Sequence, residues 1–419
     1  MTVRLTQLEN GMRVLTDRMS SVETVSIGVW VAVGTRHEPA PINGVAHMLE
    51  HMAFKGTLRR SALEIAAEIE AVGGHVNAYT SREHTAYYAK VMKEHVPLAI
   101  DILADILQHS AFDPHELERE RAVILQEIGQ ANDTPDDIIY DLFQERAFPN
   151  QPMGRPVLGR AEIVRQIDRD TVSEYLKHNY AAPSMMLVAA GNLEHGAVVD
   201  LAQRAFSELP AASAARTEPA SYVGGDLRQS RELEQVHVLL GFPGFAFGDH
   251  DYYAASVVSA ALGGGMSSRL FQEIREKRGL VYSIYSFNHS YSDGGVFGVY
   301  AGTGEDEAAE LMPALCAEIR RLSDGLTTQE LERARAQLKA GLLMSLEGTT
   351  ARCEQQATHM LVFGRPLEMS ELIARIDEVD EAAVERVAMR IASGPPTLTA
   401  LGPIGRIEDY GRLSEQLSG

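Results

Sequence analysis

The amino-acid sequence predicts an α+β protein built as a tandem duplication, in which each copy is a mostly antiparallel sheet with helices packed on one face. Two internal matches indicate the duplication. The segment Glu116–Ala122 recurs as Glu330–Ala336, and the segment Glu68–Ser81 aligns with Glu273–Ser286. The chain of 419 residues is also long enough for two or three ordinary domains.

The first copy, residues 1–210, is expected to begin and end with strands of the same sheet. Strands are expected over Leu5–Thr16 and Val25–Gly34, because the second of these segments alternates and is rich in β-branched residues. A strand over Met185–Gly191 and a helix ending at Leu209 close the copy. Between them we expect a helix around His47–His51, a helix over Ala62–Val72, strands through Asn77 and over Tyr87–Val91, and helices over His95–Ser110 and Asp113–Arg146.

The second copy, residues 229–419, is expected to repeat this order after a linker over residues 211–228. The linker is predicted because Ala211–Ala220 are mainly small and polar. In the second copy we expect a strand over Glu234–Gly241, helices over Tyr252–Leu262 and Ser268–Lys277, strands over Val281–His289 and Gly295–Gly302, and helices from Glu305 and from Thr328.

The pattern His47-Met48-Leu49-Glu50-His51 predicts a metal site. On a helix, residues four apart lie on one face, so His47 and His51 can aim both imidazoles at one ion. Glu50 lies on the same side and could take a proton from a water that the metal activates. Zinc is the expected metal, because imidazole and carboxylate suit it. Such a cluster can also occur on a solvated helix face, but here the flanking residues are apolar, and burying unpaired polar groups is costly.

A catalytic zinc needs a third protein ligand, and the predicted helix after Asp113 offers two candidates. Asp113 and Pro114 suit an N-cap and first helical position, and Glu120 and Glu127 are seven residues apart on one face. The second copy has Ala334 and Gly341 at the two matching positions, and it keeps the surface charges. The duplication therefore predicts one metal ion per chain and leaves the choice between the two carboxylates open.

Several motifs together resemble the pitrilysin-type zinc peptidases with the inverted H-x-x-E-H order, including the mitochondrial processing peptidases and their bacterial relatives. The resemblance covers nearly the whole chain. It rests on His47–His51, Phe54–Thr57, Gly74–Thr80, Glu83–Tyr88, Glu120 with Glu127, and Gly263–Phe271. It implies a processing-peptidase-like fold in both copies.

The resemblance also assigns roles to residues that the pattern alone leaves undecided. The family spacing selects Glu127 as the third ligand and Glu120 as an auxiliary carboxylate that orients His51, His47 or the water. Asn77 and Ala78 match the family's substrate-binding strand. In the family, an Arg and a Tyr at the spacing of Arg275 and Tyr282 face the zinc across a cavity and bind the substrate.

By this resemblance we expect a zinc metalloendopeptidase that cleaves short unfolded peptides, and a homodimer. Both the zinc motif and the Arg/Tyr pair lie in this one chain, and in the bacterial branch the pair facing each zinc comes from the neighbouring subunit. Two alternatives stay open. One is a noncatalytic scaffold subunit of the same fold, which would be expected to lack one or more ligands. The other is a catalytic subunit that needs a separate partner.

Composition and charge restrict the remaining classes. A formal net charge of −20 disfavours nucleic-acid binding, and the acidity serves solubility or attracts basic peptides. No apolar run reaches the roughly 18–20 residues of a membrane span, so no membrane partner is expected. The beginning of the chain lacks the pattern of a secretion or transit signal, and the two cysteines do not suggest a disulfide framework. We therefore expect a bacterial cytoplasmic protein, although a processed organellar protein would look the same.

Overall fold

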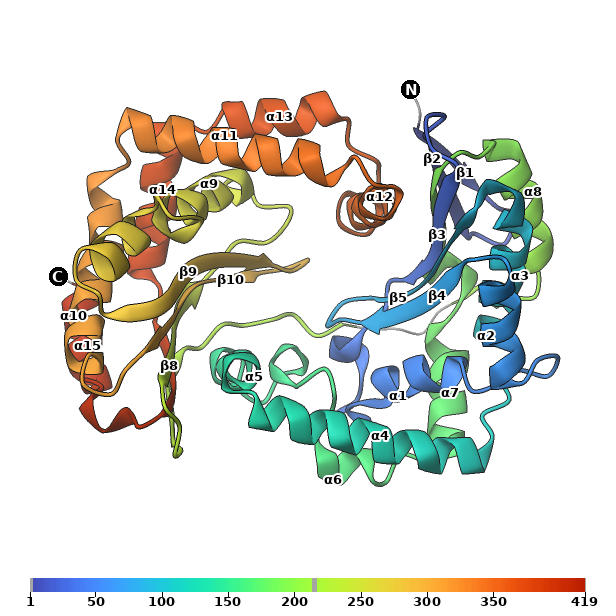
Figure 1. Ribbon diagram of the computed structural model, residues 1–419, viewed down its shortest axis with the longest axis horizontal. Helices are drawn as coiled ribbons and strands as arrows, with labels where there is room; N and C mark the ends of the chain where they lie inside the picture. The colour runs from blue at the N-terminus through green and yellow to red at the C-terminus, as the bar shows by residue number, and fades with distance from the viewer. Residues whose placement is uncertain (1–2, 213–216, 419) are drawn as a thin grey trace. The chain divides into compact units, whose positions relative to one another are not determined.

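The computed structural model describes residues 3–212 and 217–418 and divides the chain into two compact units (Figure 1). Unit 1 comprises Met1–Gln130, Arg155–Glu218 and Met344–Pro366, and unit 2 comprises Ala131–Gly154, Pro219–Leu343 and Leu367–Gly419. Each unit contains one mixed sheet with helices packed against it, which confirms the predicted α+β fold class. The helices cover both faces of each sheet, whereas only one covered face was expected. Residues 213–216 of the predicted linker lie outside the described residues, and the boundaries at 210 and 229 stay predictions.

The sheet of unit 1 has the strand order β1-β2-β6-β3-β5-β4. Neighbouring strands are antiparallel except β2 and β6, which are parallel. The strands are β1 (Val3–Gln7), β2 (Arg13–Arg18), β3 (Thr24–Val31), β4 (His75–Thr80), β5 (Thr85–Met92) and β6 (Met185–Gly191). The helices of this unit are α1 (Val45–Ala53), α2 (Ala62–Ala71), α3 (Val96–Gln108), α4 (Pro114–Asp133), α6 (Ala161–Val164), α7 (Arg169–Asn179), α8 (His195–Ala205) and α12 (Thr349–Phe363).

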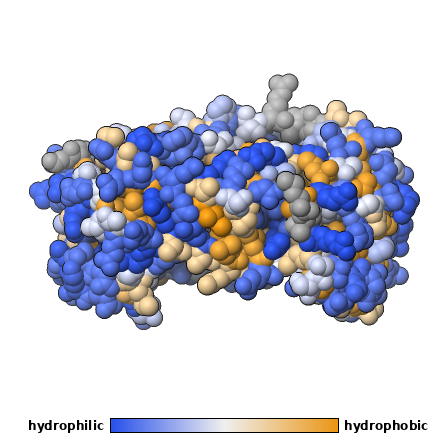
Figure 2. Space-filling view, turned by 90° about the horizontal axis from the view of Figure 1, so that it is seen from above, coloured by the Kyte–Doolittle hydropathy of each residue, from blue (hydrophilic) through white to orange (hydrophobic). Residues whose placement is uncertain are grey.

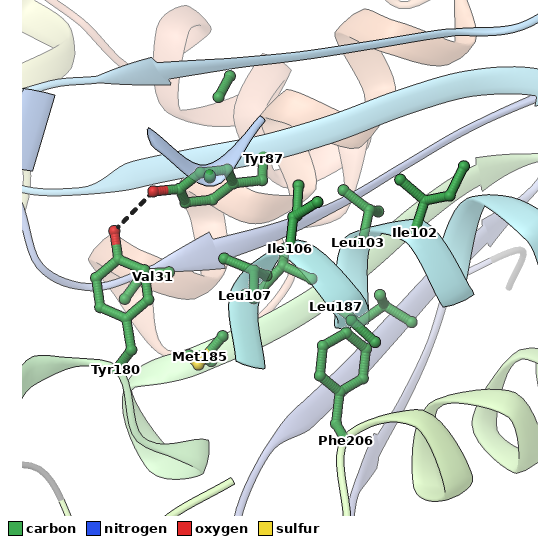
Figure 3. Close-up of a cluster of buried hydrophobic side chains, with 14 of the residues drawn as sticks. Val31, Tyr87, Ile102, Leu103, Ile106, Leu107, Tyr180, Met185, Leu187 and Phe206 are labelled. Carbon is green, nitrogen blue, oxygen red and sulfur yellow. Dashed lines mark hydrogen bonds between the residues drawn. The ribbon is translucent and has the colours of Figure 1, made fainter. Parts of the chain in front are cut away.

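One face of this sheet forms the main core of unit 1. Alternate residues of β3 and β6 point into it and pack on α3, as Figure 3 shows for Val31 and Leu187 with Leu103 and Ile106. The hydroxyl groups of Tyr87 and Tyr180 lie 3.1 Å apart in the same core. This pairing satisfies two buried polar groups that would otherwise be costly to bury.

The opposite face of the same sheet is apolar too and is covered by α12. Trp30, Met186 and Val188 contact Cys353 and Met360 of that helix. Figure 1 shows α12 on one side of β3 and helices α3 and α8 on the other. Both faces of β6 are therefore buried, which explains why its sequence is a continuous apolar run without alternation.

Unit 2 repeats the arrangement with the strand order β7-β11-β8-β10-β9, in which β7 and β11 are the parallel pair. Its strands are β7 (Gly225–Ser230), β8 (Val236–Pro243), β9 (Val281–Ser290), β10 (Gly295–Thr303) and β11 (Thr397–Gly402). Its helices are α5 (Pro135–Ala147), α9 (Tyr252–Gly263), α10 (Ala308–Arg320), α11 (Thr328–Ser345), α13 (Met369–Asp377), α14 (Glu381–Ser393) and α15 (Tyr410–Ser418). A π-helix, η6, covers Phe271–Glu276.

The second face of this sheet is covered by α5, whose Ile139 and Phe143 pack on Leu239 and Tyr300. Gly241 of β8 makes room for this helix, because a Cβ there would lie 2.4 Å from the Phe143 ring. Helices α5 and α12 therefore each cover the sheet of the other half of the sequence. This exchange was not predicted, since a match between the two copies does not show which sheet a helix covers.

Two predicted elements are each divided in the structure. The expected strand Leu5–Thr16 is a hairpin of β1 and β2, and Gly11 in its turn has a φ of 95°, which glycine adopts readily. The expected helix Asp113–Arg146 is broken at Thr134, and α5 starts at Pro135, which has no N–H to continue the preceding helix. Proline at a first helical position is common, so this break could have been read from the sequence.

The described surface agrees with the composition. Hydrophilic residues predominate on the face in Figure 2, with small apolar areas between them. None of the helices formed by residues 3–212 and 217–418 has the length and apolarity needed to span a membrane.

Candidate metal centre

The helix α1 carries the H-x-x-E-H pattern and is held at its first turn by a buried carboxylate. Gly44 is the N-cap, has a φ of 100° and offers no side chain. Glu38, from the preceding loop, accepts hydrogen bonds from the backbone N–H groups of Gly44 (2.9 Å) and Ala46 (2.8 Å) and from the Asn43 side chain (2.8 Å). These bonds satisfy amide groups that a helix start leaves without partners.

The predicted apolar setting of the two histidines is confirmed. Met48, Leu49 and Met52 of α1 are fully buried, and His47 is buried with them. The imidazole rings of His47 and His51 lie edge to face with their centroids 4.6 Å apart. One face of the helix thus presents both rings together, as the four-residue spacing predicts.

Helix α4 supplies the carboxylates from a second direction. Asp113 accepts from the amides of His115 and Glu116, which confirms the predicted N-cap. Leu117, Glu120 and Ile124 are buried along one face of α4, and Glu127 continues that face. Val123 lies beside this face and is 38% exposed.

Three atoms converge in a way that fits a metal ion. Glu127 Oε2 lies 3.6 Å from His47 Nε2 and 3.5 Å from His51 Nε2. Ligand atoms held at 2.0–2.2 Å in tetrahedral geometry are about 3.3–3.6 Å apart, so these spacings suit zinc. Glu127 Oε2 is also buried without a hydrogen-bond partner. Among the described residues, His47, His51 and Glu127 form the one group of three or more such side chains that could hold a metal ion.

Glu120 orients one of the two histidines. Its Oε2 lies 2.9 Å from His51 Nδ1, and its Oε1 lies 2.6 Å from Nζ of Lys55. A carboxylate at Nδ1 places the proton on that atom and leaves the Nε2 lone pair for a metal. Glu120 was expected to orient His51, His47 or the water, and the structure shows its contact with His51. His47 Nδ1, in contrast, is buried without a partner.

The protonation states follow from burial and from these contacts. Burial, and then the neighbouring His51, lowers the pKa of His47 to about 3, so its imidazole is neutral and able to bind a metal. Burial alone would raise the pKa of Glu120, but hydrogen bonds from Lys55 and His51 outweigh it and the pKa is lowered. Burial raises the pKa of Glu50, although the hydroxyl and backbone amide of Thr80 oppose that shift.

Glu50 lies beside the edge strand of the sheet. The hydroxyl of Thr80, the last residue of β4, donates to Glu50 Oε2 at 2.6 Å. β4 is the outermost strand and is paired with β5. The amide of Ser81 bonds to the carbonyl of His84, so by alternation the amides of Ala78 and Thr80 point to the free edge.

Asn77 and Ala78, the predicted substrate positions, lie in this strand and differ in exposure. The Asn77 side chain is exposed, and its Oδ1 accepts from the Ala78 amide at 2.8 Å. The Ala78 side chain is buried in the core. Ala78 therefore offers a ligand only its backbone.

The structure brings Arg275 and Tyr282 together within unit 2. The Arg275 guanidinium carbon lies 4.6 Å from the ring centre of Phe271 and 5.8 Å from that of Tyr282. The pairing of β9 with β10 shifts register at Thr303, and Tyr282 is the extra residue of this bulge, 76% exposed. Bulges often re-aim a side chain in this way. A role for this pair opposite the metal ligands stays a prediction.

Sequence reasoning missed three residues at this centre. Lys55 lies two residues beyond the end of α1, so helical spacing does not predict its ion pair with Glu120. Thr80 and Glu38 reach α1 from separate segments, and the sequence carries no signal of either contact.

These features define a candidate metallohydrolase centre, and comparisons with known proteins identify its family. Residues 13–161 match the pattern of insulinase, peptidase family M16, and residues 166–338 match the M16 inactive domain. An uncharacterized zinc protease of Rickettsia bellii is 40% identical over 400 residues, which cover 95% of this chain and 97% of the relative. A probable mitochondrial-processing peptidase subunit beta of Arabidopsis thaliana is 38% identical over 426 residues, covering 98% and 80%. The chain belongs to peptidase family M16, as the sequence motifs predicted.

Solved structures share the fold. A protease from Helicobacter pylori superposes with a TM-score of 0.88 at 22% identity, covering 96% of this chain and 99% of that one. A chain of complex III2 from Candida albicans superposes with a TM-score of 0.89 at 21% identity, covering 99% of both. At these identities the likeness concerns the fold alone.

Proposed function

We propose that this chain is a zinc-dependent endopeptidase that hydrolyses short unfolded peptides. The observation that carries the proposal is the convergence of His47 Nε2, His51 Nε2 and Glu127 Oε2, with the buried Glu127 oxygen left without a hydrogen bond. Relatives that match along almost the full chain bear the name zinc protease.

The donor set of two imidazoles and one carboxylate is that of a catalytic zinc site with an open position. When bound there, zinc would acidify a water molecule and polarise the substrate carbonyl. His47 is neutral because it is buried, and His51 is fixed by Glu120, so both rings are prepared for the ion.

The acid–base work falls to Glu50. Its carboxylate takes a proton from the attacking water and delivers a proton to the leaving amine. Partial burial raises its pKa, which makes it a better proton acceptor than a solvated carboxylate. Tyr282 would donate its hydroxyl to the developing oxyanion, and Arg275 would anchor a substrate carbonyl or carboxylate.

The free edge of β4 supports an extended peptide as the substrate. An edge strand accepts another strand through backbone bonds, which depend little on side-chain identity. The Ala78 amide points to that edge, and an incoming carbonyl would replace the Asn77 oxygen there. Glu50 lies beside the same edge at Thr80, so a peptide added to β4 would pass the catalytic base. A folded protein seldom presents such a segment.

The test is metal analysis and cleavage of a fluorogenic peptide by the purified chain alone. We expect one zinc per chain and turnover that chelation abolishes and zinc restores. His51→Ala and Glu127→Ala should lose both metal and activity. A chain that binds zinc at full stoichiometry and cleaves no member of a diverse peptide library would favour the scaffold alternative. Activity that appears only with a cellular partner would favour the two-subunit alternative.

A further inference from the structure

Thr80 connects two parts of the proposed site. It is the last residue of β4, the strand at whose edge we propose that peptide binds, and its hydroxyl donates to Glu50 on α1. In the view of Figure 1, α1 lies below β4, and the two elements are in contact. Among the described residues, no other side chain forms a hydrogen bond with the Glu50 carboxylate.

The position of Thr80 is fixed independently of Glu50. The neighbouring Tyr79 points to the opposite face, where its hydroxyl donates to Glu354 of α12 and lies 3.1 Å from His84 Nε2. Trp30 Nε1 donates to the same hydroxyl at 3.3 Å. The contacts of Tyr79 thus hold β4 from the face opposite to Glu50. The Thr80 hydroxyl cannot move away from Glu50 with the strand unless these contacts break.

The second copy provides an internal comparison. Ala78 and Thr80 of β4, and Ile284 and Ser286 of β9, lie on the helix-facing side of their edge strands, so Ser286 occupies the same face of its strand as Thr80. The alignment of Thr80 with Tyr285 inferred from the sequence was wrong, because Tyr285 points to the opposite face, where it stacks on Tyr300. Ser286 also bonds to the facing helix, with its Oγ 3.1 Å from Ser259 Oγ and 2.6 Å from the Ser259 carbonyl oxygen. A hydroxyl bridge from strand to helix thus belongs to the repeated scaffold, but only in the first copy does it end on a carboxylate.

We propose that Thr80 is a positioning residue for the reaction, because its hydroxyl holds one oxygen of the Glu50 carboxylate and thereby directs the other oxygen to the attacking water. This inference rests on the proposed peptidase function. A glutamate side chain has several rotatable bonds, so a fixed donor on a rigid strand removes orientations that cannot accept the proton. Because Thr80 lies on the proposed substrate strand, the same bond also fixes the distance between base and peptide.

The test compares three substitutions in the zinc-loaded, full-length protein. Thr80→Val keeps the shape and removes the donor, so kcat should fall about 10-fold or more, with KM and zinc content unchanged. The Thr80 backbone amide remains, so the loss should be partial. Thr80→Ser restores a donor and should recover most of kcat. Ser286→Ala removes the corresponding bridge of the second copy and should leave kcat unchanged.

A second measurement tests the contact without catalysis. In the metal-free protein, the changes in melting temperature caused by Thr80→Val and by Glu50→Ala should not add in the double variant, because either substitution alone breaks the hydrogen bond between the two side chains. An unchanged kcat in Thr80→Val, loss of zinc with activity, or additive melting shifts would each overturn the inference. An inactive, zinc-loaded wild-type protein would instead overturn the proposed function, and the positioning role with it.

Discussion

At the scale of single residues, Glu120 and Glu127 are identical side chains on one helix face, and their different contacts suit them to different roles. Glu127 directs an oxygen without a hydrogen bond at both imidazole Nε2 atoms. Glu120 is paired with Lys55 and His51 and has its oxygens engaged. The first arrangement suits a ligand, and the second suits a group that orients one.

Replacing Glu120 by Gln should therefore weaken zinc binding without abolishing it. The neutral amide is a poorer acceptor for His51 Nδ1 and leaves Lys55 without its counter-charge, so we expect zinc affinity to fall about 10–100-fold. Competition with a chromogenic chelator measures this. Glu118→Gln, on the exposed side of the same helix, is the matched control. Equal affinities for wild type and Glu120→Gln would contradict the role.

Glu38 makes stability depend on pH. Burial raises its pKa to about 7, against hydrogen bonds from Ala46, Gly44 and Asn43. The folded state then holds the proton more tightly than the unfolded state, so this group's contribution to stability is full below pH about 4.5 and is lost as the pH rises to about 7. In metal-free protein, the advantage of wild type over Glu38→Gln should shrink by up to about 3 kcal/mol over that range. Urea unfolding at several pH values measures it, and a difference that stays constant would refute the shift.

The residues that the sequence predicted at the site are those whose spacing carries information. His47, Glu50 and His51 lie on one helix, so their proximity follows from helical geometry. The comparison of the two copies singled out Glu120 and Glu127 as candidates for the third ligand, and the family resemblance then selected Glu127. Thr80 and Glu38 reach α1 from a strand and a loop, and only the tertiary fold brings them there.

At the scale of elements, α1 depends on glycine at its start. A Cβ at Gly44 would lie 3.0 Å from Gly159 Cα, and the backbone there has a φ of 100°. We expect Gly44→Ala to lower the free energy of unfolding by about 1–2 kcal/mol or more. Gly129→Ala in α4 is the control, because no atom lies within 4 Å of its Cβ position and alanine favours helix by up to about 1 kcal/mol. Denaturant unfolding measures the free energy of unfolding of both variants. An unchanged value for Gly44→Ala would contradict the need for glycine at the start of α1.

Local patterns predicted many of the strands and helices, but they missed strands β7 and β11 and did not predict the exchange of α5 and α12. Helix α5 was included in the helix expected over Asp113–Arg146, and α12 was not identified as a separate helix. Their placement follows from the second apolar face of each sheet, where Met186 and Val188, or Leu239 and Val296, need cover. The sequence of β6 indicates a second covered face, because its apolar residues form a continuous run without alternation.

At the scale of the whole molecule, the exchange predicts that the first half does not fold fully alone. A fragment of residues 1–218 would expose Trp30, Met186 and Val188. The same fragment joined by a flexible linker to residues 344–366 should be more stable by more than about 2 kcal/mol, because Met360 and Cys353 are buried again. Thermal unfolding and dye binding compare the two. Equal stability would contradict the structural role of α12.

Assembly is a further proposal at this scale. Both the metal ligands and the Arg275/Tyr282 pair lie in this chain, and we propose a homodimer in which each pair serves the partner's metal centre. Mixing inactive Glu50→Gln and Tyr282→Phe chains should then restore part of the activity, since one site of a mixed dimer is intact. Light scattering provides the mass. A strictly monomeric protein, or no rescue despite proven exchange of subunits, would refute it.

The central claim is that His47, His51 and Glu127 hold a zinc ion. Anomalous diffraction from crystals of the zinc-loaded protein, recorded on both sides of the zinc absorption edge, tests it most directly. We predict one strong peak per chain, about 2.0–2.2 Å from His47 Nε2, His51 Nε2 and a Glu127 carboxylate oxygen. No peak at these residues in zinc-loaded crystals, or a peak held by other side chains, would contradict the claim.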